Sequence, residues 1–115
     1  MNLCNLTEVR ALLDRYGLAP KKGFGQNFLI RSAVPMEISA SARRLAPSDK
    51  PTGVLEIGPG VGALTQYLSM DFDRVVCVEI DHGLIPLLGE VFGGIDNVTI
   101  VEADFMQLDL PAFLD

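Results

Sequence analysis

The most informative stretch of the sequence is residues 54–65, which read VLEIGPGVGALT. Its first four residues predict a buried strand over 54–57, and a helix is predicted over 63–69. Between them lies the segment GPGVG, residues 58–62, which we call the glycine loop. A tight turn of this kind can bring backbone N–H groups and a helix N-terminus up to a ligand, although glycine turns also serve ordinary strand-to-helix connections.

The alternation of strand and helix continues toward the C-terminus. Strands are predicted over 75–80 and 98–101, and a helix weakened by Pro86 is predicted over 82–88. With right-handed crossovers, this β-α-β-α-β order gives a parallel sheet of strand order 3-2-1. The predicted fold class is α/β, the first half of a doubly wound, Rossmann-like parallel sheet, preceded by N-terminal helices.

The first 50 residues are predicted to be two helices joined by a basic arm. Asn5 and Glu8 have capping-box spacing before an amphipathic helix that ends at Gly17. Residues 19–31 mix glycine, basic residues and two phenylalanines, and they predict an ordered loop. Ser32 can cap the second helix. The residues of that helix predicted to face inward are Val34, Ile38, Ala42 and Leu45.

The charges also divide the chain near residue 50. Residues 1–50 carry eight Lys and Arg against four acids, whereas residues 51–115 carry one base, Arg74, against eleven acids. A basic arm can meet phosphates and an acidic remainder suits a cationic small ligand, but simple solvation explains the asymmetry equally well. We therefore expect an N-terminal unit over 1–50 and a half-sheet unit over 51–115.

Composition excludes several classes of protein. The chain has 115 residues, of which 49% are hydrophobic, yet no apolar run nears the ~20 residues of a membrane span. The N-terminus lacks the features of a secretory signal, so we expect a cytoplasmic protein that is not bound to a membrane. Cys4 and Cys77 support neither a disulfide framework nor a zinc site, and no metal is expected. Cys77 is predicted to be a buried thiol, and His82 an exposed helix residue.

Three acidic residues are placed to reach a ligand at the carboxyl edge of the predicted sheet. Glu79 ends the second strand, where a carboxylate can accept hydrogen bonds from both ribose hydroxyls of an adenosine, or simply face solvent. Asp104 follows the third strand and can accept a hydrogen bond from an adenine amino group. Glu56 can face the ammonium of an amino-acid moiety, or be held by neighbouring backbone N–H groups.

Two cofactors fit the glycine loop, in which Gly58 and Gly60 are the candidate binding residues. Together with Ala63 they satisfy the G-x-G-x-x-A pattern, so an NAD-dependent oxidoreductase is one alternative. A pyrophosphate would, however, meet strongly acidic surroundings with almost no compensating base. S-adenosylmethionine has no phosphate and carries a sulfonium cation, so it is the predicted cofactor.

Four segments of the chain resemble the ribosomal RNA adenine dimethyltransferases. They are KKGFGQNFL at 21–29, LEIGPGVGALT at 55–65, VEID at 78–81 and AD at 103–104. The first segment is the most specific, because other methyltransferases share the glycine loop but not this arm. Gly-Pro-Gly in the loop is more similar to the housekeeping small-subunit enzymes than to the macrolide-resistance enzymes that methylate large-subunit RNA.

The resemblance implies a class I methyltransferase fold and an enzyme of ribosome biogenesis. Its reaction would dimethylate the exocyclic amines of two adjacent adenosines in small-subunit (16S) ribosomal RNA, on the RNA or the assembling subunit. The resemblance places Asn27 and Leu29 beside the S-adenosylmethionine pocket, Gly58 near the methionine part, Glu79 at the ribose and Asp104 at the adenine.

The resemblance also implies that the chain is the N-terminal part of a longer enzyme. The family's catalytic Asn-Leu/Ile-Pro-Tyr/Phe motif follows a fourth strand, and the sequence ends at Asp115 before reaching it. No catalytic residue is therefore expected among these 115, and the part alone is expected to be inactive. A non-catalytic RNA-binding or transcription-factor relative is a further alternative.

Overall fold

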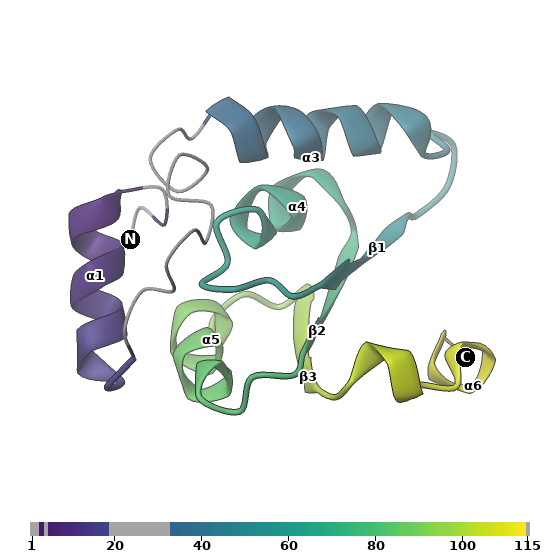
Figure 1. The fold of residues 1–115 in the computed structure, drawn as a ribbon. Helices are drawn as coiled ribbons and strands as arrows, with labels where there is room; N and C mark the ends of the chain where they lie inside the picture. The colour runs from purple at the N-terminus through teal and green to yellow at the C-terminus, as the bar shows by residue number, and fades with distance from the viewer. Residues whose placement is uncertain (1–2, 4, 19–32, 115) are drawn as a thin grey trace.

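Three parallel strands form the centre of the structure (Figure 1). The computed structural model describes residues 3, 5–18 and 33–114. Its strands are β1 (Gly53–Ile57), β2 (Arg74–Glu79) and β3 (Val98–Glu102). They are hydrogen-bonded in the order β1-β2-β3, and both pairs are parallel, with Ile57 beside Val78 and Glu79 beside Glu102. The predicted strands and their order are confirmed.

Two crossover helices lie on the same side of this sheet (Figure 1). Helix α4 (Thr65–Asp71) connects β1 to β2, and α5 (Leu84–Phe92) connects β2 to β3. The prediction that α5 spans 82–88 is wrong, because His82 lies in a turn closed by the Leu84 N–H on the Asp81 carbonyl. Pro86 falls in the first turn of the helix, where N–H groups have no acceptor within the helix, so it does not weaken α5.

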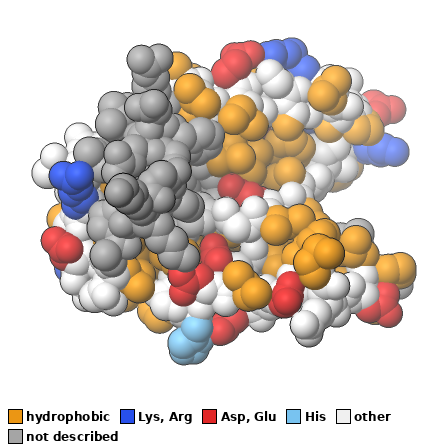
Figure 2. Space-filling view, in the orientation of Figure 1, with side chains coloured by type: hydrophobic (Ala, Val, Ile, Leu, Met, Phe, Trp, Pro, Cys, Tyr) orange, Lys and Arg blue, Asp and Glu red, His pale blue; other side chains and the backbone are white. Residues whose placement is uncertain are grey.

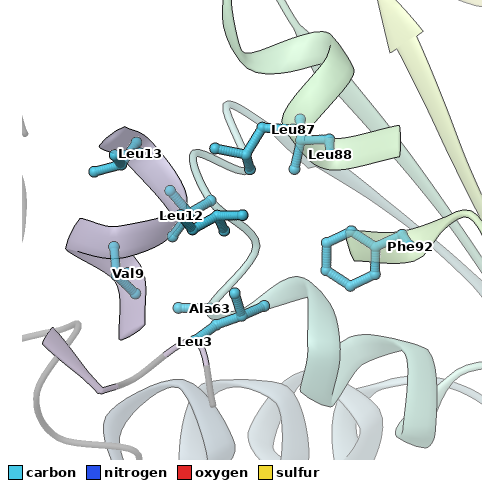
Figure 3. Close-up of a cluster of buried hydrophobic side chains, with 9 residues drawn as sticks. Leu3, Val9, Leu12, Leu13, Ala63, Leu87, Leu88 and Phe92 are labelled. Atoms are coloured by element: carbon cyan, nitrogen blue, oxygen red, sulfur yellow. The ribbon is translucent and has the colours of Figure 1, made fainter. Parts of the chain in front are cut away.

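Helix α1 (Leu6–Arg15) begins and ends as predicted. The Asn5 side chain accepts a hydrogen bond from the Glu8 N–H at 3.1 Å, and Gly17 adopts a positive φ of 68° just past the helix. The apolar side of α1 faces α5 across a buried core (Figure 3). The buried members of this core are Leu3, Val9, Leu12, Leu13, Val61, Ala63, Leu87, Leu88 and Phe92.

Helix α3 (Ala33–Leu45) packs against α4 with a face that differs from the predicted one. Its buried residues are Pro35 and Ser39, whereas Leu45 is 90% exposed. Val34 and Ile38 are also exposed, so the predicted inward face is wrong for these three residues. The Ser39 hydroxyl donates to Asp71 Oδ2 of α4 at 2.7 Å. The side of α3 that carries Ser39 therefore faces α4.

After β3 the chain forms two short elements beyond the sheet (Figure 1). They are the 3-10 turn η1 (Phe105–Gln107) and helix α6 (Leu110–Leu114). Under α4, a second core cluster of Leu68, Phe72, Val75 and Cys77 packs on the sheet. Among the described residues, no helix has the length and apolar character needed to cross a membrane.

Candidate functional site

The glycine loop leaves β1 at the carboxyl edge of the sheet and leads into α4. Gly58, Gly60 and Gly62 all have positive φ, at 70°, 61° and 96°, a conformation that side chains with a Cβ disfavour. A Cβ at Gly58 would have no neighbour within 4 Å, whereas one at Gly62 would come within 2.3 Å of the Phe92 ring. Gly58 therefore borders open space, and Gly62 packs against the core.

Glu79 lies directly beneath this loop, at the end of β2. Its side chain is buried, with only 5% of the residue exposed. Oε1 accepts a hydrogen bond from the Gly60 N–H at 3.4 Å, and Oε2 accepts one from the Asp81 N–H at 3.0 Å. The carboxylate thus joins the glycine loop to the turn before α5, and it is not a strand-end acid that simply faces solvent.

Asp104 reaches the same edge from β3. The Ala103 N–H donates to the Glu79 carbonyl at 3.1 Å, which places Asp104 one residue beyond the last contact between the two strands. Asp104 is half-buried, and its Oδ1 accepts a hydrogen bond from the Met106 N–H at 2.9 Å, so it also caps η1. The structure brings Gly58, Glu79 and Asp104 to one edge, whereas the predicted site residues Asn27 and Leu29 lie outside the described residues.

Glu56 has neither of the two environments considered from the sequence. It is buried in β1, where Oε1 accepts hydrogen bonds from the Thr65 hydroxyl and from Cys77 Sγ at 3.6 Å. Burial raises the pKa of Glu56 above its ordinary value, and the charge of Glu79 raises it further. Thr65 was not identified as a functional residue from the sequence. The proximity of Glu56 and Cys77 follows from the strand register, in which the two residues are partners on β1 and β2.

The carboxyl edge is acidic. Figure 2 shows Asp and Glu side chains gathered over the ends of the strands, where the site residues lie. The exposed His82 Nδ1 lies 2.7 Å from Glu102 Oε2 on this edge, whereas Arg74 begins β2 at the opposite end of the sheet. Within the described part of the chain, no group of His, Cys, Asp and Glu is arranged to hold a metal ion. The edge therefore suits a ligand that is neutral or cationic and rich in hydrogen-bond donors.

Comparison with known families and relatives gives a consistent result. A family model described as "Ribosomal RNA adenine dimethylase" matches residues 17–115. A protein of Streptococcus gordonii named ribosomal RNA small subunit methyltransferase A is 39% identical over 114 residues. A protein of the same name from Macrococcus caseolyticus is 41% identical over 109 residues. These alignments cover 99% and 95% of the chain, but the chain spans only 38% and 36% of the two relatives.

Solved structures agree on the fold. The crystal structure of the 23S rRNA methyltransferase ErmE superposes with a TM-score of 0.53 at 35% identity, over 63% of this chain and 30% of that one. The N-terminal domain of EvdMO1, solved with SAH bound, superposes with a TM-score of 0.65 over 95% of this chain and 50% of that one. Its sequence identity is 18%, so this second likeness concerns the fold alone. The fold is that of the class I methyltransferases.

Proposed function

Because the chain belongs to the ribosomal RNA adenine dimethylase family, we propose that it forms the S-adenosylmethionine-binding part of a ribosomal RNA adenine dimethyltransferase. The observation that carries this proposal is the buried Glu79 carboxylate, held against the Gly60 N–H at the carboxyl edge of the sheet. A carboxylate fixed at this position of an α/β sheet accepts hydrogen bonds from the two hydroxyls of a ribose.

Each remaining site residue has a role in this proposal. Gly58 borders open space, so the methionine part of the cofactor can approach its backbone closely. Asp104 accepts a hydrogen bond from the adenine amino group, and Asn27 and Leu29 border the pocket from the basic arm. The acidic edge favours a sulfonium cation and disfavours the pyrophosphate of NAD, because carboxylates repel phosphate groups.

The proposed substrate is small-subunit ribosomal RNA, alone or in the assembling subunit. Two similar relatives carry the small subunit in their names, and the glycine loop reads Gly-Pro-Gly. The basic arm, with Lys21, Lys22 and Arg31, supplies phosphate contacts to that RNA. On this proposal the protein acts in ribosome biogenesis in the cytoplasm.

The chemistry is direct methyl transfer. When bound, S-adenosylmethionine supplies an electrophilic methyl group for the exocyclic amine of adenine, twice on each of two adjacent adenosines. That amine is a weak nucleophile because its lone pair is delocalised into the ring, so orientation of the two reactants supplies much of the rate. The residues of this chain contribute by holding the adenosine and methionine parts of the cofactor in fixed positions.

The 115 residues alone are proposed to bind cofactor without transferring methyl groups. The family motif Asn-Leu/Ile-Pro-Tyr/Phe, which binds the target amine and stacks on the extruded base, does not occur in this sequence. The division into an N-terminal unit over 1–50 and a half-sheet unit over 51–115 belongs to the same proposal.

Methylation of defined RNA tests the proposed function. The full-length protein, the longer enzyme of which these 115 residues are proposed to be the N-terminal part, is incubated with radiolabelled S-adenosylmethionine and small-subunit particles made from unmethylated RNA, and large-subunit RNA is treated in parallel. The RNA is then cut with a ribonuclease and the labelled fragments are sequenced by mass spectrometry. We expect N6,N6-dimethyladenosine at two adjacent positions, with no transfer to large-subunit RNA. Transfer only to large-subunit RNA would refute the substrate, and transfer to neither RNA would refute the activity.

A further inference from the structure

A buried hydrogen bond closes across the glycine loop. Glu56 lies in β1 just before the loop, and Thr65 is the first residue of α4 just after it. Thr65 is fully buried and Glu56 is 9% exposed, and the Thr65 hydroxyl donates to Glu56 Oε1. Because these residues are nine positions apart in the chain, their bond fixes the distance between the two ends of the loop.

Cys77 extends this contact to β2. Its thiol is 3.6 Å from Glu56 Oε1, and Cys77 is the register partner of Glu56 in the sheet. Burial raises the pKa of the Cys77 thiol to about 12, so the thiol stays protonated at neutral pH. The protonated thiol can donate, as the Thr65 hydroxyl does, and Glu56 Oε1 accepts from both. Three side chains thus join β1, β2 and α4 beneath the loop.

Burying the Glu56 carboxyl group in this contact has a free-energy cost. A carboxyl group loses hydration when it is buried, and an apolar side chain of similar size would fill the same space without that cost. A second bond holds the other end of α4, where Ser39 of α3 donates to Asp71. That bond holds the same helix at the end away from the glycine loop. It therefore provides a control, because removing it should loosen α4 without directly changing the loop.

We propose that Glu56 and Thr65 are positioning residues for the cofactor, because their hydrogen bond holds the glycine loop in its ligand-binding conformation before the ligand arrives. A loop that is already ordered loses little conformational entropy on binding. A loop without this hydrogen bond must be ordered when the ligand binds, and the lost entropy weakens the affinity. The inference rests on the proposed function, since it takes the ligand of the loop to be S-adenosylmethionine or its demethylated product.

The test compares three variants of the full-length protein by calorimetric titration with S-adenosylhomocysteine and by thermal melting. T65V keeps the shape of the side chain but removes the donor, and we expect it to raise Kd roughly 5- to 30-fold. T65S retains the hydroxyl and is expected to bind like the unchanged protein. S39A removes the bond at the other end of α4, so it should lower the melting temperature and leave Kd unchanged.

A fourth variant distinguishes positioning from charge. E56Q keeps an acceptor for Thr65 but cannot carry a negative charge, so it should weaken the binding of S-adenosylmethionine and of S-adenosylhomocysteine by the same small factor. The inference is overturned if T65V lowers the melting temperature without changing Kd, or if S39A raises Kd as much as T65V does. It is also overturned if E56Q weakens only the sulfonium ligand. If the unchanged protein binds neither ligand, the proposed function itself fails.

Discussion

Replacing Gly62 with alanine is expected to destabilise the fold far more than the same change at Gly58. Both glycines belong to the glycine loop and both have positive φ, at 96° and 70°. Their surroundings differ, because a Cβ at Gly62 would lie 2.3 Å from Phe92 Cε2 and 3.5 Å from Leu3 Cδ1. A Cβ at Gly58 would have no neighbour within 4 Å.

The magnitudes follow from two separate costs. A left-handed backbone costs a residue with a Cβ about 1–2 kcal/mol, and both variants incur this cost. Overpacking of a core adds about 1–3 kcal/mol, which applies only to Gly62. Phe92 cannot move aside easily, because it is 3% exposed and is enclosed in the core with Leu3 (Figure 3). The expected loss is therefore about 2–5 kcal/mol for G62A and about 1–2 kcal/mol for G58A.

Urea denaturation of the full-length protein measures these losses, and titration with S-adenosylhomocysteine measures binding. G58A is expected to remain folded but to bind the ligand weakly, because the new methyl group occupies the open space beside the loop. G62A is expected to unfold at a lower urea concentration than G58A. Equal destabilisation by the two variants would refute the packing argument, and unchanged ligand affinity in G58A would refute the place given to the methionine part.

Three further changes test the ribose contact of Glu79, the burial of Cys77 and the basic arm. E79A is expected to weaken the binding of S-adenosylhomocysteine by about 1–3 kcal/mol in calorimetry. Glu102 is the register partner of Glu79 on β3, and E102A is expected to leave the affinity unchanged. Equal effects of the two variants would show that Glu79 does not contact the ligand. Folding raises the pKa of Cys77 from 9.0 to about 12, so the free energy of unfolding should fall as pH rises from 9 to 12, by up to ~4 kcal/mol, and C77A should lack this fall in urea titrations. A curve for C77A that matches the unchanged protein would contradict the burial of the thiol. Replacing Lys21 and Lys22 with alanine should make RNA binding less dependent on salt. The slope of log binding constant against log salt concentration should fall by roughly one unit per lost phosphate contact. An unchanged slope together with weaker cofactor binding would assign the arm to the cofactor site.

The sheet was predictable because its signals are local. Short β-branched runs bounded by glycine, proline and aspartate placed each strand to within a residue, and crossover handedness then fixed the strand order. The ends of the crossover helices were less predictable. Ala63 and Leu64 have helical character but belong to the turn, and α5 extends to Phe92 because its apolar side continues into the core.

Contacts between distant segments could not be predicted. The apolar side chains of α3 suggested an inward face, but in the structure Ser39 faces α4 through its hydrogen bond to Asp71, and Leu45 is exposed. Likewise, the sequence placed Glu56 beside the glycine loop without showing which way its side chain points. Only the packing of α4 on the sheet brings the Thr65 hydroxyl to that carboxyl group. The place of Glu79 and Asp104 at the carboxyl edge was therefore predictable from the sequence, and their hydrogen-bond partners were not.

Calorimetric titration of the full-length protein with S-adenosylhomocysteine and, separately, with NAD tests most directly whether this chain forms an S-adenosylmethionine site. We predict one saturable site per chain for S-adenosylhomocysteine, lost or strongly weakened in E79A, and no heat of binding for NAD. Saturable NAD binding that depends on Glu79, or S-adenosylhomocysteine binding that does not depend on Glu79, would contradict this prediction.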